Sequence, residues 1–436
     1  MIAAKSAIRI DAPTSVWGKR SEPACDAIRR VRIAHVQLLP LLSGVQRVTL
    51  DELERLDPAS FDRTLILQSP GPFSEAAEKR GVRVQYAPAM IRAVRPAADW
   101  RAYRQLRELF RAGQFDVVHT HSSKPGVLGR MAARAAGVPT IVHSVHGFAF
   151  PAAGRVKRAI FTAAERLAAT RCDAVVCLNP ADAATCTDEL KLLAGKVRLL
   201  PNGVDPNQRK PLSEFERETI RREAFGVGPE DKVVGMVGRL WPQKDPLTFV
   251  DIICRLRDFG EDRTGGPVTG VLIGDGNLRP QVEAAVREAG LNARFRLLGW
   301  REDAAKLIAA ADVSCLPSRW EGLPLVILEA LAAAVPVVAS DISGNRDAIE
   351  PDGDGLLCPP GDAAAFAEAI RGLLVDDERR AAFGDVARAR IREQFDVSDR
   401  VRRIVELYRE LGAPLGDRDG VLDLNEALGA PAEAPR

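Results

Sequence analysis

The sequence predicts an α/β protein made of two Rossmann-like domains, each a doubly wound parallel sheet, that face each other across a cleft. Short apolar runs, typical of buried strands, alternate with longer amphipathic stretches, typical of helices. After a polar interval the same alternation begins again. A length of 436 residues also exceeds one core, at roughly 150 residues per domain.

The first set of elements contains seven apolar runs that we interpret as strands. They lie at residues 31–39, 63–69, 82–88, 116–121, 140–147, 173–179 and 197–203. Helical periodicity is found between them at residues 45–56, 125–137 and 155–171. Such βαβ alternation predicts a parallel sheet covered by helices.

The second set repeats this pattern after residues 206–225, a polar segment that we interpret as a hinge. Its predicted strands are 232–240, 269–276, 294–300, 312–318, 336–342 and 355–360. Its predicted helices are 246–260, 277–290, 323–334 and 362–376. Ligands of such sheets bind beyond the carboxyl ends of the strands, so polar groups there are candidate site residues.

Composition points to a cytoplasmic protein. The chain is 46% hydrophobic and 28% charged, as in soluble globular proteins. Its seven cysteines include no CxxC pair, which favours buried thiols in a reducing compartment. No apolar run approaches the ~18 residues of a membrane span, and no secretory h-region is present. A basic first half beside an acidic second half suggests that the first half faces something anionic.

Two glycine-containing turns follow predicted strands of the second set. In GRLWPQK, Gly238 allows a sharp turn, and Arg239 and Lys244 offer two cations to one anion. The alternative is a solvated basic loop. In IGDGNL, Gly274 and Gly276 allow a ligand to approach free N–H groups, although such turns occur in every α/β protein.

The stretch WEGLPLVILEA (320–330) predicts a helix start aimed at the cleft. Pro324 suits the first turn of a helix, where its missing N–H is no loss. The free amides of Leu325 and Val326, with the helix dipole, can hold phosphate oxygens.

A glutamate stands on either side of those amides. We expect Glu321 and Glu329 on the cleft side, where their carboxylates can accept hydrogen bonds from sugar hydroxyls. The alternative places Glu321 as a favourable charge near a helix N-terminus and Glu329 on the surface.

Together these elements resemble the retaining family-4 glycosyltransferases of the GT-B fold, over roughly residues 31–410. Within that family the chain looks most like bacterial transferases of capsule and exopolysaccharide assembly, through HSSKPGVLGRMAARAAGVP and SGNRDA. The motifs that carry the resemblance are SGVQRV (43–48), HTHSSKPGVLGRMAARAAGVPTIVHSVHGF (119–148), LLPNGVD (199–205), GRLWPQK (238–244), GDGNLRP (274–280), EGLPLVILE (321–329), GNRDAI (344–349) and GLLCPPGD (355–362).

The resemblance implies a division of labour between the domains. Residues 31–205 would bind the acceptor, and residues 206–394 the nucleotide sugar. A helix at 395–412 would cross back to the first domain. Residues 1–30 and 413–436 would be a flexible extension and a flexible tail.

The resemblance also assigns roles to single residues. Arg239 and Lys244 would bind the donor diphosphate and stabilise the leaving nucleotide, Glu329 would bind the ribose hydroxyls, and Glu321 would touch the transferred sugar. His146 would contact the sugar near the reacting carbon. The catalytic set implied is thus His146, Arg239, Lys244 and Glu321. The donor-binding set is Gly44, Asn202, Gly238, Arg239, Lys244, Gly274, Gly276, Glu321, Gly322, Leu323, Leu325, Val326 and Glu329.

Two further implications concern the first domain. The resemblance implies that Gly44 approaches the donor diphosphate. The family often has paired glycines in this first loop, and the chain departs from that pattern because Ser43 precedes Gly44. His121 and Lys124 would line the acceptor site.

We expect no metal or other cofactor. Two cations and a helix N-terminus can neutralise the charge that develops on the diphosphate. The DxD matches at Asp352–Asp354 and Asp417–Asp419 are interpreted as turn chemistry. No carboxylate is evident as a nucleophile. The resemblance implies that the anomeric configuration is retained, and this would follow if the acceptor attacks on the face from which the nucleotide departs.

All five histidines lie in the first half of the chain. We expect His119 and His121, on one predicted strand, to point to opposite faces. Zinc ligands rarely spread over three strands without cysteine or acid help, so we favour an acceptor-lining or structural role over a metal site.

The segment 91–113 combines six arginines with apolar residues at helical spacing, including Trp100 and Phe110. Its cationic face can lie on an anionic membrane. The alternative is an ordinary surface helix with its apolar side in the core.

We therefore expect a retaining, metal-independent transferase that moves a sugar from UDP-hexose or UDP-N-acetylhexosamine to a lipid-linked glycan, as in bacterial surface polysaccharide synthesis. Its partners would be the nucleotide sugar, a glycan or polyprenyl-diphosphate-linked acceptor, and the inner face of the cytoplasmic membrane. The alternatives are a GDP-mannose-dependent mannosyltransferase and a non-catalytic nucleotide-sugar-binding protein. A 2-epimerase of the same fold would lack the GRL…K and two-glutamate signature, and nucleic-acid binding has no recognised module here.

Overall fold

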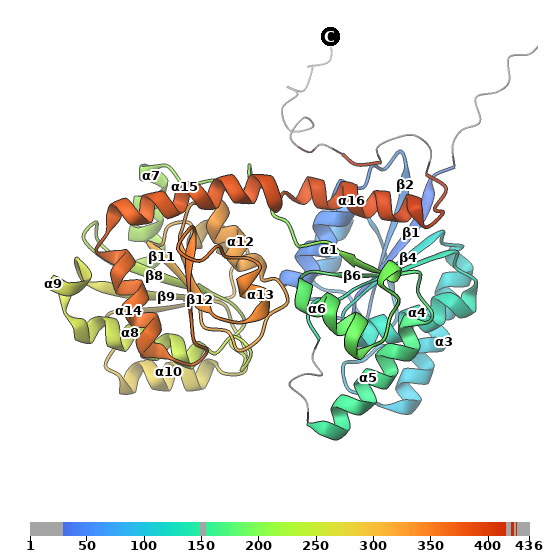
Figure 1. Ribbon diagram of the computed structural model, residues 1–436, viewed down its shortest axis with the longest axis horizontal. Helices are drawn as coiled ribbons and strands as arrows, with labels where there is room; N and C mark the ends of the chain where they lie inside the picture. The colour runs from blue at the N-terminus through green and yellow to red at the C-terminus, as the bar shows by residue number, and fades with distance from the viewer. Residues whose placement is uncertain (1–28, 149–153, 416–419, 423, 425–436) are drawn as a thin grey trace, which may run out of the picture.

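The computed structural model describes residues 29–148, 154–415, 420–422 and 424 of the chain (Figure 1). The predicted N-terminal extension lies almost entirely outside these residues, and so does most of the predicted tail.

The first domain contains a seven-stranded parallel sheet in the order β3-β2-β1-β4-β5-β6-β7. All seven strands were predicted, each slightly longer than observed or shifted by one or two residues. Their bounds are β1 (Val31–Val36), β2 (Phe61–Leu67), β3 (Arg83–Tyr86), β4 (Val117–His121), β5 (Thr140–Ser144), β6 (Ala174–Cys177) and β7 (Val197–Leu199).

The second domain contains a six-stranded parallel sheet in the order β10-β9-β8-β11-β12-β13, which repeats the strand order of the first through its sixth strand. Its strands are β8 (Lys232–Val237), β9 (Val268–Ile273), β10 (Phe295–Gly299), β11 (Val313–Leu316), β12 (Val337–Ser340) and β13 (Gly355–Cys358).

Helices surround both sheets (Figure 1). Those of the first domain are α1 (Gly44–Arg55), α2 (Pro72–Glu78), α3 (Pro96–Gly113), α4 (Ser123–Ala136), α5 (Arg155–Ala169) and α6 (Pro180–Ala184). Those that follow are α7 (Glu214–Ile220), α8 (Pro246–Phe259), α9 (Glu261–Thr264), α10 (Arg279–Glu288), α11 (Ala304–Ile308), α12 (Leu325–Ala332), α13 (Ser343–Arg346), α14 (Ala363–Leu374), α15 (Asp377–Gln394) and α16 (Val397–Glu410).

Each sheet has a hydrophobic core on both faces. Along β1, Ile33 belongs to one core cluster and Ala34 to another. Along β8, Val233 and Val234 likewise belong to two different core clusters. Because successive side chains of a strand point to opposite faces, strands covered on both sides read as continuous apolar runs, which is why the sequence pattern located them.

The last helix of the second half packs on the first domain. The chain leaves α15 beside Val204, whose N–H and C=O bond to Phe395 (2.9 Å) and Val397 (3.1 Å). Val401 and Tyr408 of α16 are then buried in the first domain's core. In Figure 1, α15 and α16 run as one red band across both domains.

The predicted hinge is helical over much of its length. Ser213 and Glu216 form a capping box that starts α7, and a π-helical turn continues it to Phe225. Arg221 then binds the buried Asp312 of the second domain at 2.9 Å. Residues 213–225 are therefore helical, because helix capping outweighs their polar composition, and the hinge stays a prediction.

Part of the predicted tail is anchored. The N–H of Asp57 donates to Gly420 O at 3.0 Å, and Leu422 N–H donates to Arg55 O at 2.8 Å. Among the described residues, no helix is long and apolar enough to cross a membrane.

Candidate active site

Loops from both domains enclose a cavity of about 290 Å³. The strand order of each sheet reverses next to its first strand, β1 or β8, and the loops after these two strands reach the cavity, as expected for the switch points of doubly wound sheets. The predicted residues that line it are Gly44, His146, Asn202, Gly238, Arg239, Lys244, Gly274, Glu321, Gly322, Leu323, Leu325, Val326 and Glu329.

Three predicted residues do not line this cavity. A Cβ on Gly276 would lie 2.6 Å from Leu240 O, so this glycine serves the packing of the turn. His121 is fully buried. Lys124 Nζ lies 2.6 Å from the Asp99 carboxylate. Neither predicted acceptor residue, His121 or Lys124, is therefore placed to touch a ligand in the cavity.

Lys244 and Glu321 form an ion pair inside the cavity. Lys244 Nζ lies 2.5 Å from Glu321 Oε1, and both side chains are mostly shielded from solvent. Gln243 Nε2 donates to the carbonyl of Trp320 at 3.0 Å and lies 3.4 Å from Glu321 Oε2. The loop after β8 is thus tied to the loop after β11, and the charge of Lys244 is already compensated before an anion binds.

Arg239 is a cation of this site without an ion pair, as is Arg47, which also lines the cavity and bonds to Glu302 O. No described carboxylate pairs with Arg239, and its guanidinium lies 5.2 Å from the centre of the Trp241 ring. Arg92, from the first domain, lies 4.5 Å from the same ring. Burial lowers the pKa of Arg239 and the Arg92 charge lowers it further, while the Glu321 carboxylate opposes the change. An anion between the domains would relieve both effects.

The N-terminus of α12 opens onto the cavity. Pro324 was predicted in the first turn of the helix and is the N-cap residue directly before it, because its ψ of 121° is extended. Leu325 and Val326 follow it and line the cavity. Their backbone N–H groups donate to no other residue of the described chain, which leaves them available to phosphate oxygens at the positive end of the helix dipole.

Glu329 is buried one turn further along α12, with 8% of its surface exposed. The surface alternative for this residue is therefore wrong. Burial raises its pKa, while Arg209 and Arg47 oppose the rise. Its closest cation is Arg209, 3.7 Å away. Glu329 also lines a second cavity, of about 210 Å³, so it stands between the two.

Two asparagines of the first domain hold the loop that carries Glu321. Asn179 Nδ2 donates to Gly322 O at 2.8 Å, and Asn202 Nδ2 donates to Leu323 O at 2.8 Å. A Cβ on Gly322 would lie 3.1 Å from the backbone of His146. The loop after β11 therefore meets the first domain through its backbone.

Two glycines that line the cavity differ in their surroundings. Gly274 has φ of 146°, and a Cβ there would lie 1.9 Å from Gly238 O, so only glycine fits. Gly44, at the start of α1, has no atom within 4 Å of its virtual Cβ and faces open space.

His146 lines the cavity, and its Nε2 lies 3.1 Å from His121 Nδ1. Burial is the main cause that lowers the pKa of His146, to about 3. His119 and His121 lie on the same face of β4, with ring centroids 4.4 Å apart, so the expectation of opposite faces is wrong. Side chains two positions apart on a strand share a face.

The first DxD match is a structural turn. Asp354 is fully buried, accepts a hydrogen bond from Glu350 N–H at 2.8 Å and pairs with Arg390. Asp352 is exposed at the turn. Neither lines the cavity. The second match, Asp417–Asp419, lies outside the described residues.

Four residues near the site were not identified from the sequence. Asn179 ends a predicted strand, as Asn202 does, and that position could have singled it out. Trp300 follows β10 at the same sheet edge. Arg92 and Arg209 stand in irregular segments, where sequence periodicity gives no signal.

Comparisons with known proteins identify the family. The model of "Glycosyltransferase Family 4" matches residues 42–208, and that of "Glycosyl transferases group 1" matches residues 231–376. An Escherichia coli UDP-Gal:alpha-D-GlcNAc-diphosphoundecaprenol alpha-1,3-galactosyltransferase is 36% identical over 384 residues, which cover 88% of this chain and 97% of the relative.

The chain belongs to glycosyltransferase family 4.

Other members are more distant. A Mycobacterium tuberculosis GDP-mannose-dependent alpha-mannosyltransferase is 32% identical, over 76% of this chain and 84% of its own. Among solved structures, Anabaena HepE in complex with UDP-glucose matches with a TM-score of 0.74 at 22% identity, over 87% of this chain and all of HepE. That likeness confirms the predicted GT-B fold. The two family models together span both domains, and the protein is a glycosyltransferase.

Proposed function

We propose that this family-4 enzyme transfers a hexose from a UDP-hexose to a sugar linked to polyprenyl diphosphate, with retention of anomeric configuration and without a metal. The observation that carries the proposal is the uncompensated cation Arg239 in the same cavity as the free amides of Leu325 and Val326. The E. coli relative, which acts on UDP-Gal and a diphosphoundecaprenol-linked GlcNAc, supports this donor and acceptor class.

The arrangement suits departure of a nucleoside diphosphate. Negative charge grows on the diphosphate as the glycosidic bond breaks. Arg239, the α12 amides and Lys244 would meet that charge from the second domain, and preorganised donors of this kind stabilise a transition state without reorganisation. This is the chemical reason for proposing that no metal is needed.

Retention is proposed from the family resemblance, and the placement of the carboxylates bears on its route. Glu321 is the carboxylate in the position assigned to the sugar, and it is paired with Lys244 at 2.5 Å. A carboxylate held by a cation is a weak nucleophile, which favours attack by the acceptor on the face from which the diphosphate departs over a covalent glycosyl-enzyme. Glu321 then serves to orient the sugar hydroxyls.

The same geometry gives Glu329 and His146 separate tasks. Glu329 lies beyond the α12 amides and would accept hydrogen bonds from the ribose hydroxyls. His146, from the first domain, would donate to the transferred sugar. Gly44, with open space around it, would let the donor diphosphate approach α1.

The test is a panel of nucleotide sugars with a synthetic GlcNAc-diphospholipid acceptor. The panel contains UDP-galactose, UDP-glucose, the corresponding UDP-N-acetylhexosamines and GDP-mannose, the donor named for the mycobacterial relative. We expect turnover and thermal stabilisation by a UDP-hexose, an α-linked product by NMR, and full activity after dialysis against EDTA. Turnover only with GDP-mannose would replace the proposed donor. Binding without transfer to any acceptor would favour the non-catalytic alternative.

We further propose peripheral contact with an anionic membrane through α3 and α5, which both contact α4. The apolar side of α3 packs in the core through Leu106 and Phe110, as the surface-helix alternative expected. Its Trp100 is 61% exposed, however, and on α5 Val156 and Ile160 are 75% and 59% exposed. Exposed apolar side chains beside arginines suit a lipid headgroup region.

A further inference from the structure

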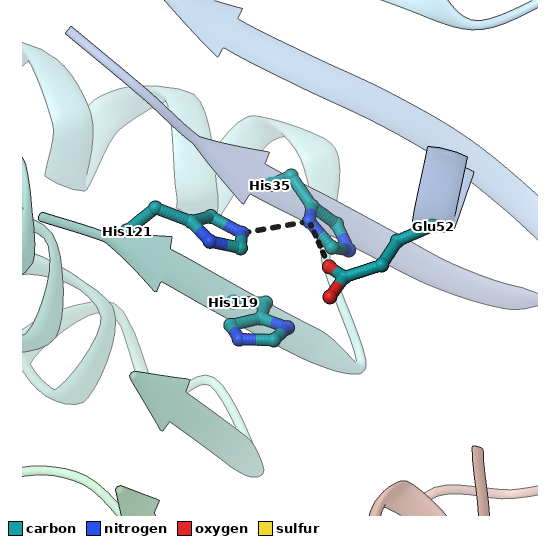
Figure 2. A group of neighbouring side chains, drawn as sticks. All are labelled: His35, Glu52, His119 and His121. Atoms are coloured by element: carbon teal, nitrogen blue, oxygen red, sulfur yellow. Dashed lines mark hydrogen bonds and ion pairs between the residues drawn. The ribbon is translucent and has the colours of Figure 1, made fainter. Parts of the chain in front are cut away.

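A row of buried imidazoles extends from the cavity into the first domain. His35 comes from β1, His119 and His121 come from β4, and Glu52 comes from α1 (Figure 2). None of these four residues is more than 1% exposed. His121 Nε2 lies 2.9 Å from His35 Nδ1, and on its other side His121 Nδ1 lies 3.1 Å from His146 Nε2.

These two hydrogen bonds couple the tautomeric states of His35, His121 and His146. A neutral imidazole carries one N–H, so His121 donates through one nitrogen and accepts through the other. If His35 Nδ1–H donates to His121, then His121 Nδ1–H donates to His146 Nε2, and His146 holds its own proton on Nδ1. If the row runs the other way, His146 Nδ1 is a bare acceptor and His35 carries its proton on Nε2.

Glu52 and Arg400 decide between the two directions. Glu52 Oε2 lies 3.8 Å from His35 Nδ1, so the carboxylate favours a proton on that nitrogen. Arg400 Nη2 donates to Glu52 Oε1 at 2.7 Å, and both side chains are buried. Burial raises the pKa of Glu52, and the charge and hydrogen bond of Arg400 oppose the rise. Because a guanidinium keeps its charge, a protonated Glu52 would leave a buried cation unpaired, and we take this pairing to favour the carboxylate. The reverse direction would also bury a His35 Nε2–H that has no acceptor among the described residues.

Neutral imidazoles are expected throughout the row. Burial lowers the pKa of His35 to about 3 and is the main cause that lowers the pKa of His146 to about 3. The pKa values of His119 and His121 are lowered well below the ordinary value, again chiefly by burial. What the row can transmit at neutral pH is therefore the position of a proton on each ring, and not a positive charge.

The same residues could be read as a zinc site, since ligand atoms of His35, Glu52, His119 and His121 lie within 4.8 Å of one another. Their existing partners argue against it. His119 Nδ1 lies 2.6 Å from Tyr408 Oη, and its Nε2 lies 2.8 Å from Ser144 Oγ, so both ring nitrogens are occupied. A dication would also sit beside the Arg400 guanidinium, where only one carboxylate is available.

We infer that Glu52, His35 and His121 are positioning residues that hold His146 as the Nδ1–H tautomer, so that His146 donates a hydrogen bond to an oxygen of the sugar bound in the cavity. This role rests on the proposed function, since it needs a sugar beside His146. Nδ1 is the nitrogen left for that purpose, because it bonds to no residue in the described part of the chain. His119 packs against the His121 ring and keeps it in plane.

The direct test is ¹⁵N NMR of the full-length protein labelled at histidine, without substrate. Five histidines give ten ring nitrogens, and a His146→Gln variant identifies the pair that belongs to His146. We expect a protonated Nδ1 and an unprotonated Nε2 on His146. A protonated Nε2 on His146 overturns the inference, and so does stoichiometric zinc in the purified protein.

A matched pair of variants tests the relay. In His35→Asn the amide Nδ2–H stands where the imidazole Nδ1–H stood, whereas His35→Leu removes the donor. We expect His35→Asn to keep the Nδ1–H tautomer of His146, and His35→Leu to give a mixture with a kcat lowered about tenfold and little change in the KM for the nucleotide sugar. His119→Asn changes the imidazole that takes no part in the two hydrogen bonds joining His35, His121 and His146, and it should leave the His146 tautomer unchanged.

The outcomes separate this inference from the proposed function. The tautomer is read without turnover, so an inactive protein with a protonated Nδ1 would refute the function and leave the relay intact. The same His146 spectrum in wild type and His35→Leu would refute the relay and leave the function intact. The wild-type spectrum decides the main point even if a variant fails to fold.

Discussion

Lys244 and Glu321, predicted to bind the diphosphate and the sugar, bind each other at 2.5 Å across two loops of the second domain. The site is therefore preassembled by its own charges. An incoming diphosphate competes with Glu321 for Lys244, whereas Arg239 has no ion pair that the diphosphate would have to break. This difference between the two cations makes their substitutions distinguishable.

Lys244→Ala should lower kcat by about 100-fold or more while the fold is retained, because the variant loses a cation that acts on the leaving diphosphate. Glu321→Gln should also lower kcat. The double variant should be less impaired than the product of the two effects predicts, because the paired residues act together. Steady-state kinetics on all three proteins, with circular dichroism as the control for folding, would measure this; near-normal turnover of Lys244→Ala contradicts its assigned role.

Arg239→Ala should abolish most of the thermal stabilisation by UDP, since it removes the uncompensated charge, and Arg239→Lys should restore part of it. The matched control is Arg371→Ala, which removes an arginine of α14 that pairs with Glu368. Melting curves with and without UDP measure the difference. Equal stabilisation of Arg239→Ala and the control would remove Arg239 from the donor site.

Glu329→Gln should be more stable than wild type at neutral pH in the absence of donor, although it is less active. Burial raises the pKa of Glu329 above its ordinary value of 4.5, so the folded state holds the proton more tightly than the unfolded state. Its contribution to stability is therefore present below the unfolded pKa and is lost as the pH rises through the folded pKa. Denaturant unfolding from pH 4 to 8 should show the two proteins converging at the acid end; a gap that widens toward acid would reverse the assignment.

Gly274→Ala should destabilise the protein by about 3 kcal/mol or more, because its Cβ would collide with Gly238 O. Gly44→Ala meets no atom within 4 Å and should leave the melting temperature unchanged, while raising the KM for the donor if the diphosphate approaches α1. Thermal melts and donor titrations of the pair distinguish a packing glycine from a ligand-facing one. An unchanged donor KM in Gly44→Ala would place the diphosphate elsewhere.

Trp100→Ser combined with Ile160→Ser should weaken sedimentation with vesicles that contain anionic phospholipid at low salt, because both exposed apolar side chains are removed. A control with Leu193→Ser changes another exposed apolar residue, outside α3 and α5. No vesicle binding by the wild type, or binding unaffected by the double substitution, would contradict the proposed membrane contact through α3 and α5.

The fold was predictable because both sheets are buried on two faces. Parallel strands such as β1 and β8 then carry unbroken apolar runs, and the glycines and charges after them mark the sheet edge where ligands bind. For this reason most of the predicted donor-binding residues line the cavity, including Glu321 and Glu329, which lie eight positions apart.

Contacts between distant segments are not encoded in the local sequence. The acceptor role of Lys124 stays a prediction, and its motif does not reveal that Asp99 lies 2.6 Å away. The Lys244–Glu321 pair joins loops 77 residues apart and has no local signal. The opposite-face expectation for His119 and His121 was an error of strand periodicity, and it concealed the imidazole row.

The route of α16 has a consequence for synthesis on the ribosome. Domains generally fold from the N-terminus as they emerge. Here the first domain's buried carboxylate, Glu52, receives its counterion from Arg400, and His119 receives its phenol from Tyr408, both from the far end of the chain. The first domain cannot complete its interior until the second has been translated. A premature stop codon before residue 400 would therefore harm the half of the protein that was made first.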